Sequence, residues 1–155
     1  MPETEQFLRQ AIDLARDNAR NGGRPFGAVA VMDGAVIATG VNETAATADP
    51  TAHAELMAIR AASLTLQRPR LDGCTVYASG HPVPRLCFAA MALAGVEAVY
   101  YAHSNEDGEP FGLSSASLYA DLAKPAAERS LKMHHVRVRA DDGDDPYEMW
   151  RLAER

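Results

Sequence analysis

The sequence predicts an α/β fold in which one mixed β-sheet carries helices on both faces. The first observation is a pair of β-rich runs, 27–32 and 35–40, separated by Asp33-Gly34. An Asp-Gly pair between two such runs is typical of a hairpin. The second is the alternation of helical and strand patterns after the hairpin. No repeat, low-complexity tract or linker interrupts the 155 residues, so we expect one domain spanning 1–155.

The individual elements follow from apolar spacing and from the residues that end each segment. Residues 4–20 carry apolar side chains at helical spacing, and Asn21-Gly22-Gly23 ends that helix. The polar stretch 43–50 predicts a loop. The remaining expected elements are a helix from about 51 to 62, a strand at 74–79, a helix from about 85 to 94, a strand at 98–101, a loop at 103–112, a helix near 115–122, a strand at 136–138 and a terminal helix at 146–155.

Composition and charge exclude several classes of function. The formal net charge is −6, whereas a general nucleic-acid binder needs cations to displace the counterions of phosphates, so nucleic-acid partners are not expected. No apolar run is long enough to cross a bilayer, and residues 1–5 lack the order of a signal peptide. We therefore expect a cytoplasmic protein without a membrane partner. The two cysteines, Cys74 and Cys87, do not suggest a disulfide scaffold.

The segment Thr51-Ala52-His53-Ala54-Glu55 opens a predicted helix. At a helix N-terminus, His53 and Glu55 can both reach a pocket in front of the first turn. Zinc deaminases use this His-x-Glu arrangement: the histidine binds zinc, and the glutamate, which is not a ligand, moves protons. A capped helix start in which Glu55 favours the helix dipole gives the same pattern. The second half of the deaminase signature is Pro-Cys-x-x-Cys at the next helix start, and here the strand 74–79 leads through residues 79–87 into a helix.

With these motifs in place, the chain resembles the bacterial guanine deaminase and tRNA-adenosine deaminase branch of the cytidine deaminase superfamily. The motifs that carry the resemblance are Gly23-Arg24-Pro25-Phe26-Gly27-Ala28-Val29, Asn42, Asp49-Pro50-Thr51-Ala52-His53-Ala54-Glu55, Ala58-Ile59-Arg60, Tyr77-Ala78-Ser79, Ala94-Gly95-Val96, Lys124-Pro125 and Trp150-Arg151. The resemblance implies a three-layer αβα sandwich around a roughly five-stranded mixed sheet, and a homodimer. It also implies zinc as cofactor, bound by His53 and Cys87.

One zinc-binding cysteine of the family is missing. Counting back from 94–96 places Cys87 on the second zinc cysteine and Pro84 on the first, whereas counting forward from Ser79 places the first at Val83. The segment has therefore gained a residue and lost a thiol. A catalytic zinc site normally has three protein ligands and a water. Either His81 becomes the third ligand, or zinc binds weakly through two ligands, or the pocket is metal-free and Cys87 is a nucleophile or an inert thiol.

The resemblance also assigns candidate substrate contacts. Asn42 matches a residue that hydrogen-bonds the base, Phe26 matches a pocket wall, and Asp107 lies in the loop that covers the pocket. Independently of the resemblance, the backbone of the Ala52 region and of Cys87 is expected to supply hydrogen-bond donors, because both lie at predicted helix N-termini. The acidic residue by which guanine deaminases recognise guanine aligns with Ser115, so guanine itself is not the expected substrate.

The predicted function is hydrolytic deamination of a small amino-substituted heterocycle, a free purine-like base or nucleoside. An activated water attacks the ring carbon that bears the amine, and Glu55 moves its proton to the ring nitrogen and helps ammonia leave. The alternative is a divergent member that binds a heterocycle without turnover, or uses Cys87, His53 and Glu55 in another reaction. The retained Glu55 favours the first hypothesis, and the missing cysteine favours the second.

Overall fold

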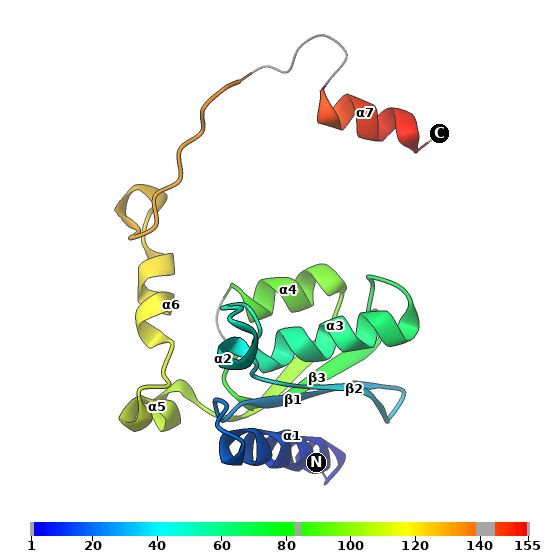
Figure 1. Cartoon of the computed structure of the whole chain (residues 1–155), viewed down its shortest axis with the longest axis vertical. Coiled ribbons are helices and arrows are strands. Elements are labelled where there is room, and N and C mark those ends of the chain that lie inside the picture. The colour runs from blue at the N-terminus through cyan, green and yellow to red at the C-terminus, as the bar shows by residue number, and fades with distance from the viewer. Residues whose placement is uncertain (1, 83–84, 139–144, 155) are drawn as a thin grey trace. The chain divides into compact units, whose positions relative to one another are not determined.

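The structure is a computed structural model that describes residues 2–82, 85–138 and 145–154. The chain divides into two compact units, Met1–Ala120 and Asp121–Arg155. The first unit contains the sheet and the candidate site (Figure 1). The expectation that 1–155 forms one domain stays a prediction.

A mixed sheet forms the centre of the first unit. Its strands are β1 (Gly27–Met32), β2 (Ala35–Val41), β3 (Cys74–Gly80) and β4 (Ala98–His103), in the spatial order β2-β1-β3-β4. Strand β1 runs antiparallel to both β2 and β3, whereas β3 and β4 are parallel. The mixed sheet is as predicted, although the described residues form four strands rather than roughly five.

The strand expected at 136–138 was a wrong prediction. Residues 136–138 pair with no strand, and the side chains of Val136 and Val138 are 74% and 83% exposed. A strand needs a neighbouring edge to satisfy its backbone N–H and C=O groups. The β-favouring side chains of residues 136–138 therefore do not form a strand without such a neighbouring edge.

The hairpin forms at the predicted place. Asp33 and Gly34 have φ angles of 51° and 74°, and Met32 pairs with Ala35 across the turn. Two consecutive residues with positive φ are the signature of the type I′ turn, whose twist matches that of the flanking strands. The Asp-Gly pair thus sets the pairing of β2 with β1 next to the turn, and an irregularity between Ala30 and Val31 shifts the register farther along the strands.

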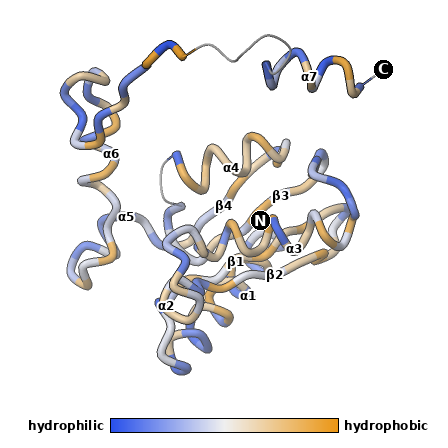
Figure 2. The backbone as a smooth tube through the Cα atoms, turned by 45° about the horizontal axis from the view of Figure 1, so that its top comes forward, coloured by the Kyte–Doolittle hydropathy of each residue, from blue (hydrophilic) through white to orange (hydrophobic). Residues whose placement is uncertain are grey.

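Helices cover both faces of the sheet, which confirms the predicted three-layer arrangement. Helix α1 (Pro2–Arg20) lies on one face, and α3 (Ala54–Leu66) and α4 (Cys87–Ala94) lie on the other (Figure 1). Alternate residues of β1 serve the two layers: Ala28 and Ala30 pack in the core cluster with α3 and α4, whereas Val29 and Val31 pack with Phe7 of α1. Helix α4 is mostly apolar along its length (Figure 2), although Cys87 and Met91 are its only buried residues.

Several short elements lie where the sequence predicted loops. They are α2 (Thr44–Thr47), α5 (Asn105–Gly108) and the 3₁₀ helix η1 (Glu109–Phe111). Helix α6 (Ala116–Ala123) follows as predicted. A single turn shows no periodicity in sequence, so elements of this length escape a search for apolar spacing.

The second unit contains the 3₁₀ helix η2 (Ala126–Glu128) and helix α7 (Pro146–Ala153). The Asp145 carboxylate caps α7 by accepting hydrogen bonds from the N–H groups of Tyr147 and Glu148, at 2.9 and 3.1 Å. In the part of the chain that the structure describes, no helix is both long and apolar enough to cross a membrane.

Candidate metal and catalytic site

The sheet topology brings the starts of α3 and α4 together. Strands β2 and β3 both run antiparallel to β1, so they point the same way and their carboxyl ends lie at one edge of the sheet. Helix α3 follows β2 and helix α4 follows β3 in the chain. The two helices therefore begin at that same edge, which is where open α/β sheets commonly bind ligands.

Close packing holds α3 on β2. A Cβ atom at Gly40 would collide with the carbonyl oxygen of Ala54 and the amide nitrogen of Ala58. The first turns of α3 thus rest directly on the strand backbone. Only glycine permits this approach, which positions the residues at the start of the helix.

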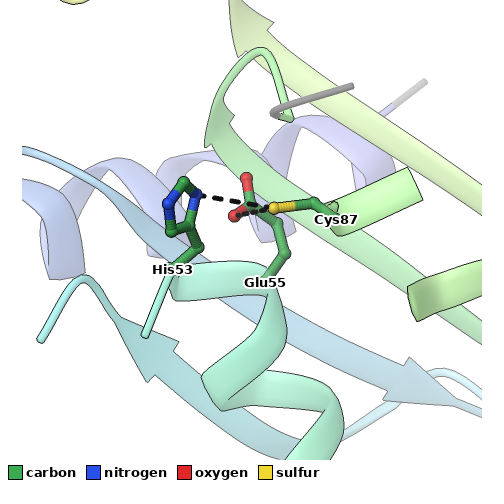
Figure 3. Close-up of side chains that lie close together, drawn as sticks. All are labelled: His53, Glu55 and Cys87. Carbon is green, nitrogen blue, oxygen red and sulfur yellow. Dashed lines mark hydrogen bonds between the residues drawn. The ribbon is translucent and has the colours of Figure 1, made fainter. Parts of the chain in front are cut away.

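His53 and Glu55 lie at the start of α3, as predicted. His53 is the N-cap residue, with φ −72° and ψ 151°, and the helix begins at Ala54 rather than near Thr51. Residues two apart do not share a helical face, but the extended backbone of His53 removes that restriction. Both side chains consequently point towards Cys87 (Figure 3).

Cys87 completes a three-residue cluster. It is the first residue of α4 and is fully buried. Its Sγ lies 3.6 Å from Nδ1 of His53 and donates a hydrogen bond to Oε2 of Glu55 at 3.5 Å (Figure 3). Candidate ligand atoms of the three residues all lie within 4.8 Å of one another. Across residues 2–82, 85–138 and 145–154, this is the one such group of histidine, cysteine and acidic side chains.

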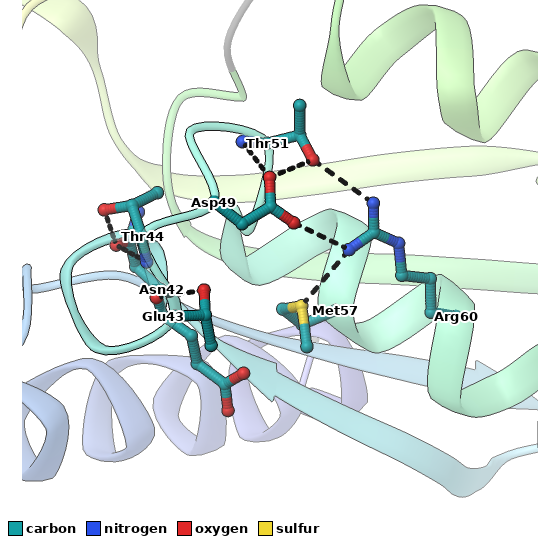
Figure 4. A network of polar contacts seen from close by, with 8 residues as sticks. Asn42, Glu43, Thr44, Asp49, Thr51, Met57 and Arg60 are labelled. Carbon is teal, nitrogen blue, oxygen red and sulfur yellow. Dashed lines mark hydrogen bonds and ion pairs between the residues drawn. The ribbon is translucent and has the colours of Figure 1, made fainter.

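A polar network anchors the turn that presents His53 (Figure 4). The carboxylate of Asp49 accepts hydrogen bonds from the N–H and the hydroxyl of Thr51, at 2.8 and 2.7 Å. The guanidinium of Arg60 lies 3.7 Å from Asp49 and donates to the Thr51 hydroxyl at 3.3 Å. The bonds from Thr51, helped by Arg60, hold the pKa of Asp49 below its ordinary value. Arg60 lies on α3, so the network ties the turn to the helix it precedes.

Burial sets the protonation of the cluster. Glu55 is 5% exposed, and burial raises its pKa, with smaller opposing effects from its own backbone N–H and from Cys87. Burial also lowers the pKa of His53, helped by the positive charge of Arg24 and opposed by a hydrogen bond with the Pro50 backbone. The imidazole is therefore neutral near pH 7, which is the form that binds metals.

The donor set fits a zinc ion. Imidazole nitrogen, thiolate sulfur and carboxylate oxygen are the ligand types that zinc takes in proteins, and catalytic sites use three protein ligands. His53 and Cys87 occupy positions that suit two of them. Val83 and Pro84, where the sequence lacks the family's first cysteine, lie outside the described residues. Neither has a side chain that can bind a metal.

A pocket of about 140 Å³ is lined by residues of this cluster. A cavity of about 150 Å³ accommodates benzene, so the volume suits a small ring compound. Both His53 and Glu55 reach the pocket. The residues that form its other walls are Arg24, Phe26, Asn42, Ala54, His81, Leu113, Ser114 and Ser115.

Asn42 lies on the pocket wall, and its role as a substrate contact stays a prediction. It is 6% exposed, and its Oδ1 accepts hydrogen bonds from the N–H and hydroxyl of Thr44, at 3.2 and 2.8 Å. Its amide nitrogen has no hydrogen-bond partner among the described residues, so it can donate to a ligand. Phe26 forms another wall, and the guanidinium of Arg24 lies 5.9 Å from the centre of its ring.

Two predicted substrate contacts have other partners in the structure. The carboxylate of Asp107 forms a capping box with Ser104, and it lines a neighbouring pocket of about 190 Å³ rather than the one beside Glu55. The N–H of Ala52 donates to the carbonyl oxygen of Asp49 at 3.1 Å, so it is already used within the turn. These contacts give both residues a structural role. A role in substrate binding stays a prediction for each.

His81 lines the pocket but lies outside the three-residue donor cluster. Its Nδ1 is 3.0 Å from the carbonyl oxygen of Pro82 and 3.2 Å from the hydroxyl of Tyr119. The rings of Tyr101 and Tyr119 pack edge-on against the imidazole, at 4.6 and 5.4 Å between ring centres. These contacts fix the ring as part of the wall.

Sequence reasoning missed Arg24, Leu113 and Ser114 as lining residues, and Tyr119 as the partner of His81. Arg24 is two residues before Phe26 in the motif at 23–29, so its place near a predicted wall residue could have indicated that it lines the pocket. Leu113 and Ser114 belong to an irregular stretch between η1 and α6. Nothing in such a stretch distinguishes a pocket-facing residue from a solvent-facing one.

Comparison with known proteins identifies the family. Residues 1–103 match the family model described as the cytidine and deoxycytidylate deaminase zinc-binding region. The chain belongs to this family. It is 40% identical to the guanine deaminase of Bacillus subtilis (strain 168) over 148 residues, which cover 95% of this chain and 93% of that one. It is 31% identical to the tRNA-specific adenosine deaminase of Agrobacterium fabrum (strain C58 / ATCC 33970), with 92% and 100% covered.

Solved structures agree with this membership. The X-ray structure of guanine deaminase from Bacillus subtilis superposes with a TM-score of 0.85, with 96% of this chain and 93% of that chain covered at 40% identity. A guanine deaminase from Nitrosomonas europaea gives a TM-score of 0.67 at 29% identity, with 74% and 65% covered. The predicted resemblance, the cytidine deaminase fold and the zinc-binding character of the domain are thereby confirmed.

Proposed function

We propose that this protein is a hydrolytic deaminase, an aminohydrolase that removes an amino group from a small purine-like heterocycle as ammonia. The observation that carries the proposal is the buried carboxylate of Glu55, beside His53 and Cys87 and at the edge of a ring-sized pocket. A module that only bound a heterocycle would need no buried proton carrier. The relationship to guanine deaminase and tRNA-specific adenosine deaminase supports the same reaction class.

His53 and Cys87 would hold the zinc ion. When bound, zinc lowers the pKa of a water molecule to about 7 and so supplies a nucleophile at neutral pH. Glu55 takes the proton that this water loses as its oxygen bonds to the ring carbon, and passes it to the adjacent ring nitrogen. Glu55 then takes the remaining proton from the hydroxyl on the ring carbon and gives it to the amine. The C–N bond breaks, ammonia leaves, and the ring carbon keeps the oxygen as a carbonyl. The raised pKa of Glu55 suits a group that must both accept and release a proton.

The pocket walls orient the substrate. We propose that the Asn42 amide donates a hydrogen bond to an acceptor on the heterocycle, while Phe26 packs against the ring. The pocket presents a hydroxyl at Ser115 rather than a carboxylate. That hydroxyl donates to Oδ1 of Asn105 at 3.1 Å. Two structures similar to this chain, at 28% and 26% identity, hold 2,6-diaminopurine and 8-azaguanine, so purines and their analogues are the compounds to test first.

We also propose that the protein is a homodimer, as the resemblance implied. Three large apolar side chains on α3 and α4 are strongly exposed: Leu64 at 79%, Phe88 at 64% and Leu93 at 80%. A dimer interface would remove such side chains from water. Light scattering of the purified protein should give the mass of two chains. A monomer at micromolar concentration would contradict the proposal.

The function is tested by ammonia release. The wild type should release ammonia from at least one member of a panel of aminopurines, aminopurine nucleosides and pterins. Glu55→Gln should reduce turnover by roughly 10²–10⁴-fold, because proton transfer by a positioned side chain contributes that much. Glu5→Gln, an exposed change on α1 across the sheet, is the matched control and should keep full activity. If the wild type binds a purine but releases no ammonia from any compound, the protein is a binding member of the family and the proposal fails.

A further inference from the structure

We propose that Glu55 is the third protein ligand of zinc in this chain, taking the place of the missing cysteine while it also moves the proton. The inference rests on the proposed function and deepens it. In zinc deaminases generally the glutamate is not a ligand. This chain differs because its signature segment, 83–87, holds a single cysteine.

The separations between the donor atoms match a tetrahedral zinc site. With Zn–S near 2.3 Å and Zn–N and Zn–O near 2.1 Å, the S···N and S···O edges of a tetrahedron are each about 3.6 Å. Sγ of Cys87 lies 3.6 Å from Nδ1 of His53 and 3.5 Å from Oε2 of Glu55. The nitrogen and oxygen donors lie within 4.8 Å of each other, and a tetrahedral edge between them is about 3.4 Å. Rotation of the long Glu55 side chain can close that edge.

Other candidates for the third ligand are less well placed. His81 lies outside the donor cluster, with its Nδ1 beside the Pro82 carbonyl and the Tyr119 hydroxyl. Within the described residues, no further histidine, cysteine or acidic side chain joins His53 and Cys87. Glu55 is therefore the candidate third ligand that the fold places beside His53 and Cys87.

Burial supplies an independent reason for a cation beside Glu55. The side chain is 5% exposed and forms no ion pair with a lysine or arginine among the described residues. A buried carboxylate is costly unless it is paired with a charge or coordinates a metal. A carboxylate also has two oxygens, so one can bind zinc while the other accepts the proton. The two roles of Glu55 are thus chemically compatible.

The test is a set of zinc affinities, measured by competition with a chromophoric chelator in the absence of substrate. Four proteins are compared: the wild type, Glu55→Gln, a restored protein in which Val83–Cys87 is replaced by Cys-Pro-Met-Cys, and the restored protein carrying Glu55→Gln. In the native segment, Glu55→Gln should weaken zinc binding by more than about 100-fold, since losing an outer-shell partner alone costs 10–100-fold. In the restored segment, where two thiolates and His53 bind the ion and Glu55 is at most an outer-shell partner, the same substitution should weaken zinc binding by no more than roughly 10–100-fold. His81→Ala in the native protein should also leave affinity unchanged.

Comparison of the restored protein with and without Glu55→Gln also shows whether the fold tolerates glutamine at position 55. Circular dichroism checks that each variant is folded. Equal zinc affinity in the wild type and Glu55→Gln would overturn the inference, as would a wild type that binds no zinc. A large loss in His81→Ala would overturn it in favour of His81. Ammonia release is measured separately: a Glu55→Gln variant that keeps its zinc but loses turnover refutes Glu55 as a ligand and leaves the proposed function intact.

Discussion

Gly40→Ala tests whether the contact between β2 and α3 positions the site. The added methyl group would meet the backbone of Ala54 and Ala58, which cannot swing aside as a flexible side chain can. Overpacking of this kind costs typically about 1–3 kcal/mol, while the entropy gained by replacing glycine returns only about 0.4–1 kcal/mol. We therefore expect a net loss of about 1–2 kcal/mol in the free energy of unfolding.

For a chain of this length, 1 kcal/mol lowers Tm by roughly 2–4 °C, so thermal denaturation followed by circular dichroism should resolve a fall of several degrees. Turnover should fall as well, because α3 carries His53 and Glu55, and a displacement of about 1 Å can cost roughly 100-fold. Thr39→Ala, at the exposed neighbouring position, is the control. An unchanged or raised Tm in Gly40→Ala, with full activity, would refute the view that this close approach places the catalytic helix.

Two further predictions concern the turn before α3 and the pocket wall. The lowered pKa of Asp49 contributes stability that is present above the ordinary aspartate pKa of about 3.9 and is lost as pH falls through the lowered value. Asp49→Asn should therefore be less stable than the wild type near pH 7, with the difference shrinking in acid. Urea unfolding across that range measures it, and a difference independent of pH would contradict the assignment. Asn42→Ala should raise KM for the heterocycle by roughly 10-fold with a smaller change in kcat, as expected when one hydrogen bond to bound substrate is lost; an unchanged KM would remove Asn42 from the binding site.

Much of the fold could be predicted because local signals agreed with the tertiary structure. The apolar spacing of residues 4–20 and the Asp33-Gly34 pair specify α1 and the hairpin without knowledge of their neighbours. The short helices α2 and α5 could not be found, since one turn has no periodicity to detect. The strand predicted at 136–138 does not form, because a β-favouring run becomes a strand only where a neighbouring strand can pair with it.

Some features of the candidate site could also be predicted from the sequence, whereas others could not. His53, Glu55 and Cys87 could be predicted because each stands at a helix start and because the family motif names their chemistry. Their closeness in space depends on β2 and β3 running in the same direction, which the sequence does not display. The orientation of His81 depends on Tyr101 and Tyr119, which come from later segments. The hydrogen bond from the Ala52 N–H within its own turn depends on backbone geometry. The spacing of residues in the sequence therefore could not predict the orientation of His81 or this bond.

The most direct test of the central claim follows the oxygen atom. The wild type is incubated in ¹⁸O-labelled water with the purine that gives most ammonia, and the product is analysed by mass spectrometry. Hydrolytic deamination by the Glu55 site predicts that the label enters the ring carbonyl in equal amount to the ammonia released, and that Glu55→Gln forms almost none of this product. An unlabelled product, or a labelled one formed equally fast by Glu55→Gln, would contradict the account.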